Sequence, residues 1–220
     1  MSNFKNEYIQ LNGENIPYKF TDTLDGEKIR SSIIKGYGRL KKFASSQNWD
    51  KHVEESFIDS IEIYDSKPEF DYRVKEILDL DQEIVFPPSF SAGLEGKILI
   101  SLSPELYFKN YPDGNEKGFF EKLVTHEIAH RLHVRILNGD EDAMGPLWLF
   151  EGFSTYVANQ FAGAEQKLSE TEIWKIVSST QRGSYLKYNY VFKHFMEKYG
   201  LKPLLKAAKR DDLVEWLRSD

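Results

Sequence analysis

The spacing of apolar residues predicts a helix early in the chain and strands after it. From about Asp25 to Trp49, apolar residues recur every three or four positions, and Asp25 is suited to cap the amino end of that helix. Apolar and polar residues then alternate in SFIDSIEIY, which predicts a strand. A further strand is expected in GLEGKILISLS, whereas FDYRVKEILDL fits a short helix or a strand equally well.

From Phe119 to the carboxyl end, the pattern is helical almost throughout. Turn-forming stretches such as YGLKP separate the helices. We therefore expect an α+β protein whose first half mixes strands with helices and whose second half is all-helical. The expected division is an N-terminal α/β lobe at residues 1–118 and a helical lobe at residues 119–220, which together form one functional unit.

Composition excludes several classes of protein. Forty per cent of the residues are hydrophobic and 14% are aromatic, which is enough for a packed core. The net charge is −6, and lysine and arginine are scattered among acidic residues, so we expect no nucleic-acid partner. Because the chain has no cysteine, disulfides, thiolate metal sites and a cysteine nucleophile are excluded.

The sequence gives no sign of export or membrane insertion. Its first twenty residues lack the apolar core of a signal peptide, and no apolar run reaches the length of about 18 residues that a spanning helix needs. We expect a cytoplasmic protein without a membrane partner, although a secreted protein from which the leader has been removed would have the same pattern.

Candidate chemistry is concentrated in KLVTHEIAHRLHVR, which runs from Lys122 to Arg135 and holds three of the five histidines. Apolar residues lie on most sides of this predicted helix, so it should be largely buried. Buried imidazoles need partners, and either a metal ion or hydrogen bonds can provide them.

The spacing of His126 and His130 is suited to a metal ion. Residues four apart on a helix have Cβ atoms about 5–6 Å apart, so two imidazoles can converge on one zinc ion. Glu127 lies about 100° round the helix from His126 and can reach a water molecule on that ion. The His-Glu-x-x-His pattern thus combines two ligands and a general base in one turn.

His133 competes with this assignment. It lies about 10.5 Å along the axis from His126, too far for both to bind one ion comfortably. A pair of His130 and His133 is possible but leaves Glu127 without a role. A metzincin would need glycine at position 133 and histidine at 136; His133 and Ile136 exclude that class.

A third ligand is expected, because catalytic zinc usually takes three protein groups and a water. Glu151 lies in the otherwise apolar stretch PLWLFEGFSTYVANQ. It can cap or pair at the surface, or it can coordinate a buried cation. The neighbouring His-Glu-x-x-His pattern favours coordination.

HEIAH and WLFEGFSTYVA, with twenty residues between His130 and Glu151, resemble the gluzincin metallopeptidases. The similarity is greatest to the catalytic domains of the aminopeptidase N and leukotriene A4 hydrolase group and to their smaller stand-alone relatives. The resemblance implies a thermolysin-like zincin fold, a Zn²⁺ ion bound by His126, His130 and Glu151, and Glu127 as general base. It covers about residues 119–200 and the strand AGLEGKILIS, which would form the sheet edge beside the cleft.

SYLKYNYVFKHFMEKYG is similar to the helix of that group that opens with a transition-state tyrosine. Counting back from Tyr199 and Gly200 places this tyrosine at Tyr185. Tyr188 and Tyr190 remain alternatives, and all three can also be packing aromatics.

One departure from the family concerns specificity. The aminopeptidases carry a Gly-x-Met-Glu-Asn stretch that binds the substrate's amine, whereas this chain has FSAGLEGKILI, with Glu95 as the only acid there. The resemblance therefore implies a zinc metallopeptidase acting on peptides or proteins, without fixing where it cuts. Two alternatives stay open: a zinc hydrolase of a non-peptide amide or epoxide, and a regulatory or binding domain that keeps zinc without turnover.

Overall fold

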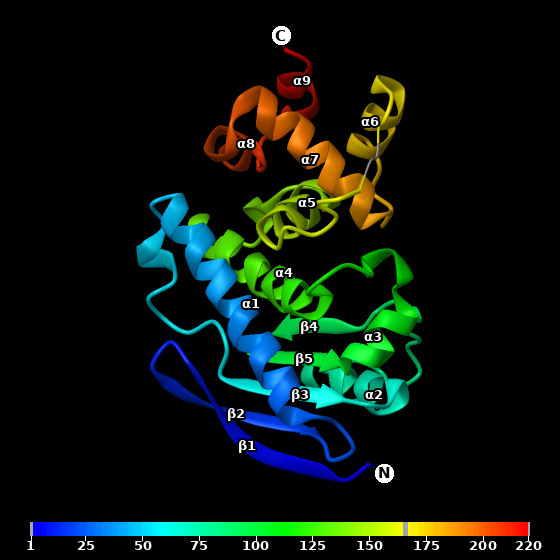
Figure 1. The fold of residues 1–220 in the computed structure, drawn as a ribbon. Helices are drawn as coiled ribbons and strands as arrows, with labels where there is room; N and C mark the ends of the chain where they lie inside the picture. The colour runs from blue at the N-terminus through cyan, green and yellow to red at the C-terminus, as the bar shows by residue number, and fades with distance from the viewer. Residues whose placement is uncertain (1, 165–166, 220) are drawn as a thin grey trace. The chain divides into compact units, whose positions relative to one another are not determined.

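The computed structural model describes residues 2–164 and 167–219. Within them it has a five-stranded mixed sheet and nine α-helices, which confirms the predicted α+β class. The chain forms two compact units, Met1–Ile128 and Ala129–Asp220, and the boundary falls inside one continuous helix, α4 (Phe119–Ile136). All the strands belong to the first unit, and the described part of the second unit is helical (Figure 1).

The first unit is built on a sheet with the strand order β1-β2-β3-β5-β4. The strands are β1 (Phe4–Leu11), β2 (Glu14–Thr21), β3 (Ser60–Tyr64), β4 (Ala92–Glu95) and β5 (Ile98–Leu102). The three central strands β2, β3 and β5 are parallel, and β1 and β4 are antiparallel to their neighbours at the two edges. Parallel neighbours need crossover connections, which helices provide here.

Helices cover the sheet of the first unit. They are α1 (Gly26–Ser46), α2 (Lys67–Ile77), α3 (Pro104–Asn110) and the start of α4, with short 3₁₀ helices η1 (Asp50–His52) and η2 (Pro112–Gly114). Helix α1 connects β2 to β3 (Figure 1). Its first residue, Gly26, lies against the ring of Phe20 of β2. Helix α2 buries Phe70 and Val74 against residues of β3 and β5.

Local sequence explains two of these helices. The predicted helix at about residues 25–49 is α1, and Asp25 Oδ1 accepts a hydrogen bond from Lys28 N at 3.1 Å, as a helix cap does. The ambiguous stretch FDYRVKEILDL lies mostly in α2. Ser66 caps that helix and Pro68 stands in its first turn, so the start signal precedes the ambiguous stretch.

Two parts of the sheet differ from the prediction. The single strand expected in GLEGKILISLS is two strands, β4 and β5, because Gly96 and Lys97 adopt positive φ values and reverse the chain between them. The first residues form the hairpin β1–β2, which was not predicted. Its turn is Asn12-Gly13, and both residues have positive φ, as a tight hairpin turn requires.

The second unit consists of packed helices. After the end of α4 come η3 (Asp142–Met144), α5 (Leu147–Val157), α6 (Glu170–Val177), α7 (Tyr185–Tyr199), α8 (Leu201–Ala207) and α9 (Leu213–Arg218). Helices α5 and α7 pack closely at Gly152, where an added Cβ would lie 2.6 Å from Phe192 Cβ. From Phe119 onwards, every regular element in the described part of the chain is a helix, as predicted.

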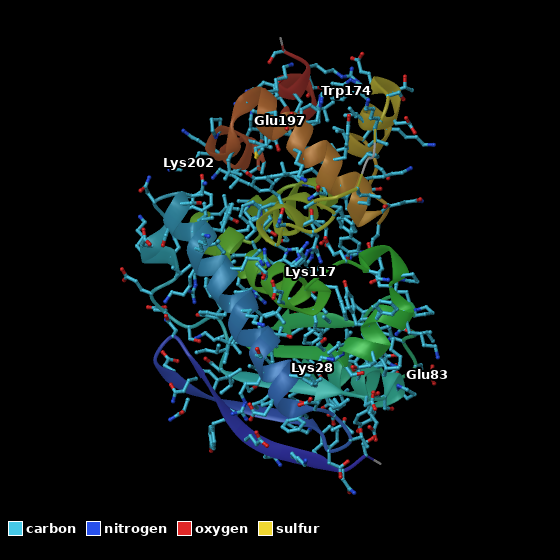
Figure 2. The ribbon with its side chains drawn as sticks, viewed as in Figure 1. Lys28, Glu83, Lys117, Trp174, Glu197 and Lys202 are labelled. Atoms are coloured by element: carbon cyan, nitrogen blue, oxygen red, sulfur yellow. The ribbon has the colours of Figure 1, made fainter. Side chains whose placement is uncertain are left out.

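Charged residues of both signs lie on the surface of each unit. Figure 2 labels Lys28, Glu83, Lys117, Glu197 and Lys202, and all five are exposed. In the basic stretch LKPLLKAAKR the lysines are exposed while Leu204 and Leu205 are buried. Among the described residues, no helix combines the length and the apolar character needed to cross a membrane.

Within the first unit, a close contact between α1 and α4 fixes the helix that carries the histidines. A Cβ added at Gly36 would lie 2.6 Å from Glu121 O and 3.0 Å from Val124 Cβ. Thr125 Oγ1 lies 3.0 Å from Gly36 O and 2.8 Å from Glu121 O, so its hydroxyl ties the two helices together. Thr125 directly precedes His126, and this contact therefore sets the position of His126.

Two glycines of α1 provide a matched test of this contact. Gly36→Ala should lower the free energy of unfolding by about 1–3 kcal/mol, because the new methyl group meets backbone atoms of α4. Gly38→Ala should raise it by about 0.5–1 kcal/mol, because a Cβ there meets nothing within 4 Å and alanine favours the helix. Urea unfolding followed by circular dichroism measures both changes, and equal effects of the two variants would contradict the proposed close contact.

Candidate metal centre

Helix α4 presents two histidines one turn apart. Four apolar residues hold it in the interior by burying their side chains: Leu123, Val124, Ile128 and Leu132. His126 is 5% exposed, and His130 is partly buried. Because α4 is continuous, one helix places His126, Glu127 and His130 together, as the His-Glu-x-x-His spacing predicts.

Helix α5 brings Glu151 to the same place. This residue is only 3% exposed, unlike a surface cap, and its Oε2 lies 3.4 Å from His130 Nε2. One ligand atom from each of His126, His130 and Glu151 lies within 4.8 Å of the other two. Twenty residues separate His130 from Glu151 in the sequence, and folding makes the two neighbours.

The donor set fits zinc. Two imidazole nitrogens and one carboxylate oxygen are the ligands of many catalytic zinc sites, which keep a fourth position for water. Zinc binds such atoms at about 2.0–2.2 Å, which separates tetrahedral ligands by about 3.4 Å. One ligand atom from each of the three residues lies within 4.8 Å of the other two, which is near that separation, so the group could hold a metal ion.

A serine on α5 contacts the other nitrogen of His130. Ser154 Oγ lies 3.0 Å from His130 Nδ1, and Ser154 is completely buried. Glu151 and Ser154 are three residues apart on α5 and therefore share a helix face. That single face contacts both nitrogens of the His130 ring.

Arg182 connects Glu151 to Tyr185 within the second unit. Its Nη1 lies 3.1 Å from Glu151 Oε1 and also donates a hydrogen bond to the hydroxyl of Tyr185. Tyr185 is the first residue of α7, as predicted, and Ser184 stands at the N-cap position without a side-chain cap bond. Arg182 thus bridges the Tyr185 hydroxyl and Glu151, a candidate metal ligand.

The two alternative tyrosines have different surroundings. The hydroxyl of Tyr188 accepts a hydrogen bond from Gly183 N and donates one to Gln181 O at 3.3 Å. It therefore shapes the loop that carries Arg182. Tyr190 is partly buried on the same helix. Of the three, Tyr185 is the one whose hydroxyl shares a hydrogen-bonding partner with Glu151.

Glu127 is partly buried beside His126. The pKa of Tyr107 is raised first by burial, then by the charge of Tyr111, and third by the charge of Glu127. Tyr107 therefore lies within electrostatic range of the Glu127 carboxylate. A carboxylate next to a candidate metal ligand, with part of its surface open to solvent, is suited to exchange protons with water.

The structure places His133 outside the ligand group. It is 0% exposed, its ring packs on Phe153 with centroids 4.6 Å apart, and neither ring nitrogen has a hydrogen-bond partner among the described residues. Burial, with a smaller contribution from His130, lowers the pKa of His133 to about 3. His133 is therefore a neutral imidazole in the apolar interior.

Comparisons with models of protein families, with curated proteins and with solved structures give no match. The case for a metal centre therefore rests on the residues themselves.

Two residues that contact the candidate ligands, Ser154 and Arg182, are not among the residues predicted from the sequence. A signal for Ser154 was available, because it follows Glu151 by three residues and so shares its helix face. No comparable signal exists for Arg182, because a turn between helices brings it to Glu151.

Acid should destabilise the protein partly through His133. Its pKa is about 3 in the folded protein and about 6.5 when unfolded, so only the unfolded chain takes up this proton between those values. This contribution to stability is complete above pH 6.5 and falls by up to about 1.4 kcal/mol per pH unit as the pH drops towards 3.

His133→Leu removes the titrating group and an unpartnered polar side chain. In chelator, urea unfolding between pH 7 and pH 5 should show a shallower loss of stability than in the wild type, with little cost at pH 7. Identical pH dependence in both proteins would show that His133 is not a buried neutral imidazole.

Proposed function

We propose that this protein is a zinc-dependent hydrolase of peptide bonds, of the gluzincin type and with a thermolysin-like zincin fold. The observation that carries the proposal is the convergence of His126, His130 and the buried Glu151, with Glu127 adjacent on the same helix. Three protein ligands are typical of a catalytic zinc, whereas structural zinc usually has four. The resemblance of HEIAH and WLFEGFSTYVA to gluzincins agrees with this assignment.

Each residue has a definite role in the proposed reaction. Zinc held by His126, His130 and Glu151 would act as a Lewis acid and would lower the pKa of a nearby water molecule towards neutrality. Glu127 would accept a proton from the water as the water oxygen attacks the peptide carbonyl carbon. Glu127 would then pass that proton to the nitrogen of the leaving amine as the C–N bond breaks, which returns its own carboxylate to the ionised state.

Tyr185 donates a hydrogen bond to the oxyanion that develops on the carbonyl oxygen. Arg182 supports this role, because its Nη1 donates to the Tyr185 oxygen and leaves the tyrosine's own proton available. A cationic donor also makes the phenol a better hydrogen-bond donor through cooperative polarisation. The same nitrogen holds Glu151, so one guanidinium positions both a ligand and the oxyanion donor.

The function is tested by Glu127→Gln, which keeps the size of the side chain but cannot accept the proton. Wild-type protein should contain about one zinc per chain by elemental analysis and should cleave a peptide library, with activity lost in chelator and restored by zinc. The variant should keep its zinc while the rate of hydrolysis falls by about 100-fold or more.

Other outcomes of that experiment have clear meanings. Zinc without any peptide cleavage in the wild type would favour a binding or regulatory domain, or a different substrate bond. Loss of zinc from Glu127→Gln would make Glu127 a ligand and overturn the assigned role.

Tyr185→Phe tests the oxyanion donor. Zinc content and stability should be unchanged and KM nearly so, while kcat should fall by about 10- to 1000-fold, because the hydrogen bond is strongest in the transition state. Tyr190→Phe, on the same helix, is the matched control and should keep near wild-type kinetics. Normal turnover in Tyr185→Phe together with a large loss in Tyr188→Phe or Tyr190→Phe would move the role to that tyrosine.

A further inference from the structure

We propose that Ser154 is a positioning residue that fixes the His130 ring so that Nε2 faces the metal ion; this inference rests on the zinc site of the proposed function. The imidazole of His130 makes one contact at each of its two ring nitrogens. Ser154 Oγ lies 3.0 Å from Nδ1, and Glu151 Oε2 lies 3.4 Å from Nε2. Both contacts come from α5.

The burial of Ser154 supports a specific role for its hydroxyl. The residue is 0% exposed within a helix whose neighbouring positions are mostly apolar. Serine is a weaker helix former than alanine, and a buried hydroxyl without a partner is costly. His130 provides a partner at good hydrogen-bonding distance.

The chemistry of imidazole explains what this contact does. A neutral histidine that binds a metal through Nε2 carries its proton on Nδ1, and that proton needs an acceptor. Ser154 Oγ is placed to accept it. A hydroxyl can also act as a donor, so it can satisfy Nδ1 in the other tautomer before metal enters.

The adjacent residue provides a matched control. Thr155 is equally buried, but its Oγ1 donates to Gly152 O at 2.9 Å and accepts from Asn189 Nδ2 at 3.2 Å. It lies about 100° round the helix from Ser154. Removing its hydroxyl perturbs the same helix without touching the His130 contact.

The experiment measures the zinc affinity of the full chain by competition with a chromophoric chelator. Ser154→Ala should raise the Kd for zinc by about 10- to 100-fold, as loss of such a partner typically does. Thr155→Val should leave the Kd near the wild-type value. Urea unfolding of both variants in chelator shows whether they are folded under the conditions of the titration.

The outcomes separate this inference from the proposed function. If the wild-type chain binds no zinc, the proposed function fails. If the wild type binds zinc and Ser154→Ala binds it equally well, or if Thr155→Val weakens binding as much as Ser154→Ala, the role of Ser154 fails alone.

A second measurement reports on the hydrogen bond directly. Long-range ¹H–¹⁵N NMR of the zinc-saturated wild type should show a proton on His130 Nδ1 that exchanges slowly with water. In zinc-saturated Ser154→Ala this proton should exchange faster, because its acceptor is gone. Unchanged exchange in that variant would overturn the proposal, because a purely structural serine would not protect this proton.

Discussion

The burial of the Glu151 carboxylate is the constraint on which the site depends. A carboxylate that is 3% exposed must be compensated by positive charge or by hydrogen bonds, since an unpaired buried charge is very costly. Arg182 lies at 3.1 Å from one oxygen and His130 at 3.4 Å from the other. A cation held by His130 and Glu151 would strengthen this compensation. The packing of α5 against α7 at Gly152, the residue after Glu151, helps to keep the carboxylate in this position.

The site also depends on a helix α4 that is held firmly in place. Its residues place two imidazoles and a carboxylate within one turn, and the close contact of Gly36 with Glu121 and Val124 leaves little freedom for that part of the helix. Thr125 adds a hydrogen-bonded link immediately before His126. A metal site of the proposed kind needs its groups held closely, and sites on packed helices meet this need better than sites on loops. Unlike the other residues of the site, Arg182 does not lie on a helix. It stands in the turn before α7, and its side chain is more than half exposed.

Much of this arrangement could be predicted from local sequence. The spacing of His126 and His130 fixes their common face, and the apolar surroundings of Glu151 indicate its burial. The hairpin β1–β2 is not among the predicted elements, although Asn12-Gly13 is a strong signal for a hairpin turn. The turn at Gly96 and Lys97 has a single glycine within the stretch LEGKIL, which is a weaker turn signal than a pair of turn-forming residues. The contacts of Ser154 and Arg182 depend on how α4, α5 and the turn before α7 pack, which no local pattern specifies.

The most direct test of the account is a crystal structure of the zinc-loaded protein with anomalous diffraction data at the zinc absorption edge. We expect one strong anomalous peak per chain, bonded at about 2.0–2.2 Å to His130 Nε2, to an imidazole nitrogen of His126 and to the carboxylate of Glu151. Glu127 should lie near the ion without binding it directly. A peak bonded to Glu127 or His133 in place of these ligands, or the absence of a peak at this position, would contradict the account.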